Sequence, residues 1–345
     1  MRAPKQEILY QEKIFAPKKF VRFATPADVA RYRAERLKCN TIVDLGAGIG
    51  GQTIAFAETC KKVIAVEIHP EQIEILKKNI EILGIKNVEI IIGNALDEIV
   101  IKKIKAMKPD IVFCDTERAE KGKRSIDELK PDIWKLIEEY SKITEKIAIE
   151  IPPFISDLNR LKEEYEKEFI SLNGKLNRLT IYLRKLKKCE KSAVSLPSKS
   201  RIENKNAKKI EITTSAVGFN YLYTIDPSIF MAELLNELGE RSKVKLIEMD
   251  KKGYFLSKEK IDSPFMQPYK ILDVCDNNFD EIIKSLKKLN AKSVVIRYSV
   301  LPAEYWKERK KYEERLDGNK KVHLFINKEA IICESLRYKQ NIKNT

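Results

Sequence analysis

A glycine-rich segment with one acidic residue follows a short apolar run that begins at residue 41. Asp44 stands two residues before Gly46, and Gly48, Gly50 and Gly51 come soon after it. Glycines let a loop approach a ligand closely and adopt left-handed backbone conformations. A dinucleotide would place its pyrophosphate on such a loop, whereas the neighbouring acid suits a ligand with a positively charged amino-acid end. The loop residues that we expect to contact a cofactor are Asp44, Gly46, Ala47, Gly48 and Gly50.

Two further polar residues stand where the next strands are expected to end. Glu67 closes the apolar run at 62–67, about 20 residues beyond the loop, where a carboxylate can accept hydrogen bonds from both hydroxyls of a ribose. Asn94 follows the run at 88–92 and is placed to bond the edge of an adenine. An amino-acid end, a ribose and an adenine together make up S-adenosyl-L-methionine. The sequence therefore predicts this cofactor, with further contacts from Glu67, Ile68, Asn94 and Ala95.

The fourth expected strand, at 110–114, ends in a polar segment that we assign to the reaction. Ligands of an open parallel sheet lie beyond the carboxyl ends of its strands, so Asp115 should face the methyl group. Its carboxylate would accept a hydrogen bond from the methyl acceptor and stabilise the positive charge that develops on an amine. The predicted catalytic residues are Asp115 and Arg118. The predicted substrate contacts are Thr116, Lys121, Arg124, Pro152 and Phe154.

Plainer interpretations of some of these residues stay open. Arg118 could form surface ion pairs with Glu117 on a loop. The Pro152-Pro153 pair could simply end a strand, in which case Phe154 would not stack on a base.

Short apolar runs alternate with amphipathic segments from residue 41 to residue 151. We expect strands at 41–45, 62–67, 88–92, 110–114 and 147–151, and helices at 52–58, 70–83 and about 127–142. This alternation predicts an α/β, Rossmann-like parallel sheet with right-handed crossovers. Residues 176–186 alternate with the period of a strand and could close the sheet as an antiparallel pair.

The composition changes between residues 187 and 212, where lysines dominate. This stretch either contacts phosphates or is only solvated. Beyond it, shorter helix and strand patterns indicate a second, smaller α+β domain. We expect an N-terminal arm and lead-in helix at 1–38, a cofactor-binding methyltransferase domain at 39–197, a basic connector at 198–215, the α+β domain at 216–338 and a tail at 339–345.

The charge balance favours a polyanionic partner. Lys and Arg number 66 against 51 Asp and Glu, which gives a net charge of +15, and nucleic acid is the commonest partner of so basic a chain. A proteome rich in Lys and Glu is the alternative explanation. The 6 cysteines form no Cys-x-x-Cys pair, so we expect no metal site and a reducing, cytoplasmic location. No apolar run approaches the roughly 18 residues of a membrane span.

The chain also resembles known methyltransferases. Residues 41–97 look like class I enzymes that use S-adenosylmethionine, and 44–51 with 63–67 is also similar to RNA-cap trimethylguanosine synthase. A closer resemblance, to methyltransferases with a C-terminal THUMP-like domain, covers nearly the whole chain. The segments that carry it are 23–26, 29–34, 177–183, 192–197, 221–227 and 263–272.

The resemblance implies the fold, the cofactor and an RNA substrate. Asp115 and Arg118 match the Asp-Pro-x-Arg pattern of the THUMP-like family, and Thr116 departs from it. The Pro-Pro-aromatic sequence of amino-methylating relatives is missing here, which argues against a simple assignment to N6 of adenine or N2 of guanine.

We therefore predict a methyltransferase that modifies an exocyclic or ring nitrogen of a base in structured RNA such as tRNA or rRNA. The alternatives are a small-molecule or protein methyltransferase, and an RNA-binding protein that keeps the fold without catalysis. An NAD dehydrogenase is disfavoured because no catalytic Tyr/Lys or His pairing stands out.

Overall fold

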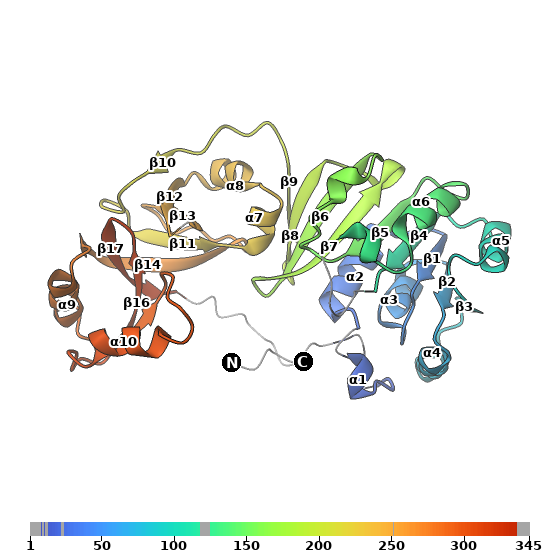
Figure 1. Ribbon diagram of the computed structural model, residues 1–345, viewed down its shortest axis with the longest axis horizontal. Coiled ribbons are helices and arrows are strands. Elements are labelled where there is room, and N and C mark those ends of the chain that lie inside the picture. The colour runs from blue at the N-terminus through green and yellow to red at the C-terminus, as the bar shows by residue number, and fades with distance from the viewer. Residues whose placement is uncertain are drawn as a thin grey trace. The chain divides into compact units, whose positions relative to one another are not determined.

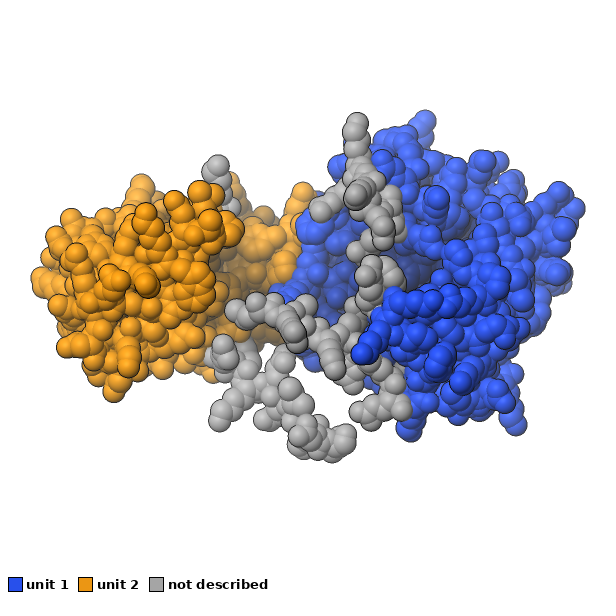
Figure 2. Space-filling model, turned by 60° about the horizontal axis from the view of Figure 1, so that its bottom comes forward, with its two compact units in different colours: residues 1–203 blue, residues 204–345 orange. Residues whose placement is uncertain are grey.

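The chain folds into two compact units, residues 1–203 and 204–345, which are coloured separately in Figure 2. The computed structural model describes residues 8, 10, 13–21, 24–117, 125–250 and 252–336. Each unit is built on its own β-sheet (Figure 1).

Unit 1 contains a nine-stranded sheet in the order β3-β2-β1-β4-β5-β7-β6-β8-β9. The first five strands of the chain are parallel neighbours, and β7 is antiparallel to both β5 and β6. The bounds are β1 Thr41–Leu45, β2 Lys62–Glu67, β3 Val88–Ile92, β4 Ile111–Asp115, β5 Ile147–Ile151, β6 Tyr165–Leu172, β7 Lys175–Leu183, β8 Lys191–Leu196 and β9 Ser200–Glu203. The predicted parallel α/β sheet and its antiparallel closing strand are confirmed.

Four helices link the parallel strands of unit 1, and two further helices precede the first strand. Their bounds are α1 Lys18–Val21, α2 Ala27–Arg36, α3 Gly51–Thr59, α4 Pro70–Ile82, α5 Glu98–Ala106 and α6 Ile133–Ser141. Ala30 of α2 and Phe56 of α3 lie in one core cluster with Phe113 of β4, so these helices cover the central strands. The helix expected at 127–142 is shorter, because Pro131 disfavours helical backbone before it. Asp132 instead caps α6, accepting hydrogen bonds from two backbone N–H groups.

Unit 2 contains an eight-stranded sheet in the order β10-β12-β13-β11-β14-β17-β16-β15. Its strands are β10 Ile212–Thr213, β11 Tyr221–Ile225, β12 Lys245–Met249, β13 Lys252–Ser257, β14 Met266–Asp276, β15 Ala291–Ile296, β16 Lys320–Ile326 and β17 Glu329–Ser335. Its helices are α7 Pro227–Met231, α8 Leu235–Ser242, α9 Phe279–Lys288 and α10 Tyr305–Glu313. Strands β16 and β17 pair antiparallel as a hairpin. The segment expected as a basic connector, 198–215, contributes β9 and β10, so it is partly strand.

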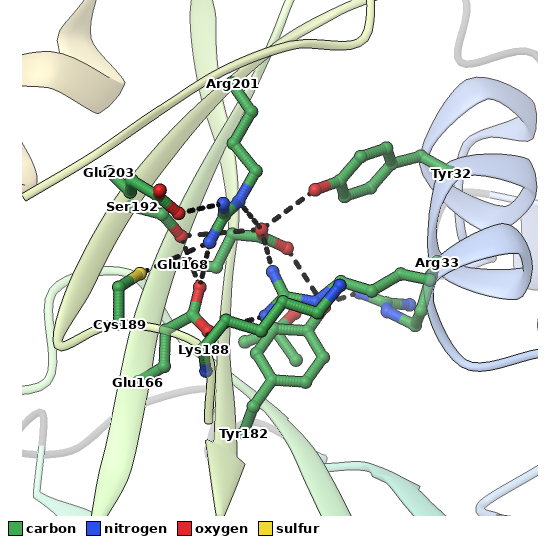
Figure 3. Close-up of polar contacts among 12 residues, drawn as sticks. Tyr32, Arg33, Glu166, Glu168, Tyr182, Lys188, Cys189, Ser192, Arg201 and Glu203 are labelled. Carbon is green, nitrogen blue, oxygen red and sulfur yellow. Dashed lines mark hydrogen bonds and ion pairs between the residues drawn. The ribbon is translucent and has the colours of Figure 1, made fainter. Parts of the chain in front are cut away.

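A buried network of charges joins α2 to the last strands of the unit 1 sheet (Figure 3). Glu166 and Glu168 of β6 are fully buried, and Arg36 of α2 forms ion pairs with both. Arg201 of β9 adds a second ion pair to Glu166, 2.7 Å long, and the Tyr182 hydroxyl donates to Glu168 at 2.9 Å. Burial opposes ionisation of Glu166, but Arg36 and further hydrogen bonds outweigh it and lower its pKa to about 2. Glu166 therefore stays charged inside the unit.

We predict that Glu168→Ala strongly destabilises unit 1. The change leaves buried donors of Arg36 and of two tyrosines without an acceptor, and breaking a buried ion pair typically costs about 3–5 kcal/mol. Urea unfolding followed by Trp134 fluorescence in a Trp306→Phe background measures this unit alone. The control is Glu164→Ala, which removes only an exposed pair with Lys187 and should cost less than about 1 kcal/mol. Equal effects of the two changes would contradict a stabilising role for the network.

Candidate cofactor and methyl-transfer site

The loop between β1 and α3 has a backbone that only glycine adopts easily. Gly46, Gly48 and Gly50 have φ angles of 79°, 57° and 99°, in the left-handed region that side chains disfavour. A Cβ atom on Gly46 would lie 2.9 Å from the carbonyl oxygen of Asp115. The loop after β1 therefore lies directly against the end of β4. This close approach brings the predicted cofactor loop beside the predicted catalytic acid.

Glu67, the last residue of β2, holds the glycine loop in place. One carboxylate oxygen accepts a hydrogen bond from the N–H of Gly48 at 2.8 Å. The other accepts from the N–H groups of Ile68 and His69, both at 2.9 Å. Carboxylate oxygens carry more than one lone pair, so the fixed group keeps capacity to accept from a ligand's hydroxyls. The Ile68 side chain next to it is 52% exposed, which is an apolar surface beside the carboxylate.

Asp44 of β1 is buried, and among the described residues only one of its two carboxylate oxygens has a hydrogen-bond partner. The hydroxyl of Thr53 donates to its Oδ2 at 2.5 Å, while its Oδ1 is buried without a hydrogen-bond partner among the described residues. Burial raises the pKa of Asp44 to about 6. An unpaired buried oxygen costs about 1–3 kcal/mol, and a ligand's ammonium group, directly or through water, would satisfy it. This orphaned acceptor fits the amino-acid end of the predicted cofactor.

The turn after β3 presents an amide group and a fixed backbone. The side-chain oxygen of Asn94 accepts a hydrogen bond from the N–H of Leu96 at 3.0 Å, so the amide nitrogen is the part left to bond a ligand. Tyr140 of α6 donates to the carbonyl oxygen of Ala95 at 2.7 Å, and its ring is buried. The helix thereby holds the turn in position.

A buried cluster of opposite charges surrounds the end of β4. Asp115 is the register partner of Glu150 on β5. Glu150 forms ion pairs with Arg33 of α2, which is wholly buried, and with Arg178 of β7 at 2.5 Å. Burial and the charge of Glu150 raise the pKa of Asp115, and the charges of Arg178 and Arg33 oppose that rise. Two carboxylates and two guanidinium groups therefore share this corner of the sheet.

Sequence reasoning missed three members of this cluster, which are Arg33, Glu150 and Arg178. One signal was present for Glu150, because it is the only charged residue in the apolar run 147–151, and an ion inside such a strand needs a partner. Its partners come from α2 and β7, far away in the sequence, so no local pattern pointed to them.

The other predicted substrate contacts have different surroundings. The Thr116 hydroxyl is buried and donates to the carbonyl oxygen of Glu150 at 2.8 Å, so it ties the end of β4 to β5. Pro152 is half-buried, and the Phe154 side chain is 48% exposed just after β5. Arg118, Lys121 and Arg124 lie outside the described residues. The roles of all these residues remain predictions.

Neither a metal centre nor a membrane span emerges from the part of the chain that the structure describes. Within it, no group of three or more His, Cys, Asp or Glu side chains could hold a metal ion. No described helix is both long and apolar enough to cross a bilayer.

Comparison with known proteins gives a family match and a fold match. The model of the RNA cap guanine-N2 methyltransferase family matches residues 39–257, which is more than half of the chain. A protein of Porphyromonas gingivalis W83 that was solved as a candidate methyltransferase superimposes with a TM-score of 0.74 and 17% identity, over 93% of this chain and 83% of that one. At this identity the likeness shows the fold alone, and it confirms the predicted Rossmann-like α/β fold.

Curated relatives match shorter segments. An uncharacterized RNA methyltransferase of Oceanobacillus iheyensis is 36% identical over 81 residues, which are 24% of this chain and 18% of that protein. A protein of Methanosarcina acetivorans assigned as ribosomal RNA small subunit methyltransferase A is 41% identical over 63 residues, 18% of this chain and 23% of that protein. The chain thus matches less than a quarter of the length of either relative.

We predict that Gly46→Ala weakens cofactor binding at least about tenfold, a loss on the order of one hydrogen bond to a charged group. The new methyl group would displace the loop from Asp115. Gly84→Ala is the matched control, because Gly84 also has a positive φ, of 64°, but has open space around it. Both changes should cost about 1–2 kcal/mol of stability from backbone strain. Calorimetry with S-adenosylhomocysteine would contradict the prediction if the two variants bound it equally well.

Cofactor affinity should also fall as the pH drops through about 6, the raised pKa of Asp44. Below that pH the protonated acid no longer attracts an ammonium group, so binding weakens by about 10-fold or more, as for a lost charge-assisted hydrogen bond. Asp44→Asn should bind weakly at every pH and lose this dependence. Titrations of S-adenosylhomocysteine between pH 5 and pH 8 check the prediction, with the exposed Asp97→Asn as a control that keeps the wild-type profile. An unchanged affinity across this range would remove Asp44 from the site.

Proposed function

Because the chain belongs to the RNA cap guanine-N2 methyltransferase family, we propose that it transfers a methyl group from S-adenosyl-L-methionine to a nitrogen atom of a base in structured RNA, such as tRNA or rRNA. The observation that carries the proposal is the contact between the glycine loop and the end of β4, where Gly46 lies against the Asp115 carbonyl. This contact brings a cofactor-binding loop and a carboxylate to one point of the sheet.

The cofactor supplies an electrophilic methyl group when it is bound. In this proposal Asp44 holds its ammonium end, directly or through water, and the loop residues Gly46, Ala47, Gly48 and Gly50 lie along it. Glu67 accepts hydrogen bonds from the ribose hydroxyls, with Ile68 beside the ring. Asn94 and Ala95 contact the adenine. Three strand ends whose polar groups are already fixed by internal hydrogen bonds lose little entropy on binding.

Asp115 orients the methyl acceptor. Its carboxylate accepts a hydrogen bond from the attacking nitrogen's N–H and stabilises the positive charge that forms there. Only the ionised acid can do this, and the guanidinium groups of Arg33 and Arg178 favour that form against the effect of burial and of Glu150. Methyl transfer depends on an in-line approach, so positioning supplies most of the rate.

The RNA contacts come from several segments in this proposal. Arg118, Lys121 and Arg124 would bind phosphates, Arg118 close to the reacting group, and Phe154, which follows Pro152, offers an exposed ring on which a base can stack. The net charge of +15 supports a polyanionic substrate. The family name and the names of the relatives point in the same direction.

We assign unit 2 as a THUMP-like domain that helps to bind the RNA. The two stretches that resemble this domain, 221–227 and 263–272, contain β11 and most of β14, which are antiparallel neighbours with Tyr221 opposite Lys270. They therefore form one continuous part of the sheet, as we expect for two stretches that together characterise one domain. The proposed division into a catalytic domain at 39–197 and a THUMP-like domain at 216–338 follows from this assignment. We propose a cytoplasmic location because the 6 cysteines form no Cys-x-x-Cys pair and fit a reducing compartment.

The test is transfer of a labelled methyl group from S-adenosylmethionine to total cellular RNA. Asp115→Asn should lower the rate by at least about 100-fold, as removal of one preorganised electrostatic contact does in other enzymes, while the affinity for S-adenosylhomocysteine stays within about twofold. The wild-type rate should rise with pH as Asp115, whose pKa is raised, becomes ionised. The exposed Asp97→Asn serves as control and should keep full activity.

The outcomes of this test separate the alternatives. Label found only in protein or in metabolites would reject RNA as the substrate. Unchanged turnover of Asp115→Asn would remove Asp115 from the mechanism. Mass spectrometry of nucleosides from tRNA and rRNA after deletion of the gene would then identify the modified nucleotide.

A further inference from the structure

The outward face of helix α10 in unit 2 carries one aromatic and three basic side chains. Successive residues of a helix are about 100° apart, which places Trp306, Lys307, Lys310 and Lys311 on one continuous arc. All four are exposed, and Trp306 is 67% exposed. Between Tyr305 and Glu313 no acidic residue falls within this arc, and the exposed Glu304 and Glu314 border it at the two ends of the helix. The helix therefore presents a ring and several positive charges together to the solvent.

The opposite face of α10 anchors it to its own unit. Tyr312 is buried in a core cluster with residues of β15 and β16. The hydroxyl of Tyr298 donates to Glu308 at 2.9 Å, and Glu313 accepts a hydrogen bond from the N–H of Val294 at 2.9 Å. The two acids of the helix are thus used for internal contacts. The outward face is held in a fixed orientation and carries a net positive charge.

Trp306 is only partly covered by its neighbours. Its ring contacts Tyr305 edge-on, with centroids 5.6 Å apart, and the guanidinium of Arg309 lies 5.3 Å from its centroid. The other tryptophan of the chain, Trp134, instead donates its indole N–H to Asp127 at 2.8 Å. Among the described residues, the indole N–H of Trp306 has no such acceptor. The ring is therefore available for an external partner.

The lysines of the arc differ in whether they form ion pairs with carboxylates. Lys311 forms an ion pair with Glu308 at 2.5 Å. Lys307 and Lys310 have no carboxylate partner in the described parts of the chain. Lys310 is four residues after Trp306, so it lies next to the ring on the helix surface.

We propose that this face of α10 binds an unpaired, single-stranded stretch of RNA. Trp306 stacks on one base, and Lys307 and Lys310 contact the flanking phosphates. Aromatic stacking combined with basic side chains is the usual way to hold single strands without reading their sequence. Lysine is depleted at interfaces between proteins, so three lysines around one tryptophan favour RNA over a protein partner. The inference rests on the proposed function, because it takes RNA as the substrate and assigns the surface that grips it.

The experiment uses the full chain with Trp134→Phe. Because the chain has 2 tryptophans, this change leaves Trp306 as the only tryptophan. Titration with an unpaired, single-stranded oligoadenylate should quench its fluorescence, as stacking requires. Measured in the wild-type background by the fluorescence anisotropy of a labelled oligoadenylate, Trp306→Ala should weaken binding about 10-fold, within the range of roughly 1–3 kcal/mol for one stacked base, and Trp306→Phe should retain part of the affinity. The double change Lys307→Ala/Lys310→Ala should reduce the dependence of log affinity on log salt by about 1.4, or roughly 0.7 for each phosphate contact on a single strand.

A matched control removes the same charge elsewhere in unit 2. Lys287→Ala/Lys288→Ala takes two exposed lysines from α9 and should weaken oligoadenylate binding less than the α10 double change does. Equal losses from the two pairs, or unaltered affinity of Trp306→Ala, would overturn the proposal, even if total RNA is still methylated and the proposed function stands. A protein that neither binds nor methylates RNA would overturn both. Binding lost in Trp306→Ala, with methyl transfer to RNA retained at high RNA concentration, supports both.

Discussion

The close approach of Gly46 to the carbonyl oxygen of Asp115 is the constraint on which the rest of the site depends. Only a residue without a side chain fits there, so the loop after β1 and the end of β4 have a fixed separation. Glu67 secures the same loop from the other side through the N–H of Gly48. The proposed cofactor-binding residues and the proposed catalytic acid are thus positioned by backbone geometry, which reorganises little when a ligand binds.

Helix α2 connects this site to the extra strands of the sheet through two arginines that are one helical turn apart. Arg33 pairs with Glu150 next to Asp115, and Arg36 pairs with Glu166 and Glu168 on β6. Burying ions costs several kcal/mol each unless the pairing is complete. Both arginines are paired with carboxylates, so the charges fix the position of α2 on the sheet. The protonation state of Asp115 therefore depends on the placement of a helix that carries no cofactor contact of its own in this proposal.

Strands and helices that have a local sequence pattern were predicted correctly. Buried charges were not predicted where their ion-pair partners are distant in the sequence. The apolar runs that end in Asp44, Glu67 and Asp115 became adjacent strand ends, because parallel strands separated by helices leave few other arrangements. Strand β6 was not predicted, because its buried Glu166 and Glu168 depend on arginines that come from α2 and β9, far away in the sequence. The cluster around Glu150 escaped prediction for the same physical reason, since a charge in a strand does not indicate which segment will neutralise it.

In the proposed mechanism, the end of β4 stabilises charge but offers the base little surface. Where amino-methylating relatives have prolines and an aromatic, this chain has Thr116, whose hydroxyl is occupied by the backbone of β5, and then Glu117 and Arg118. Stacking of the target base must therefore come from another segment, and Phe154 after β5 is an exposed ring that follows a strand paired with β4. Asp115 cannot by itself distinguish one nitrogen-bearing base from another, because a carboxylate accepts from any N–H. Selection of the target base then depends on how the protein binds the surrounding RNA. Surfaces away from the reacting atoms must provide that binding.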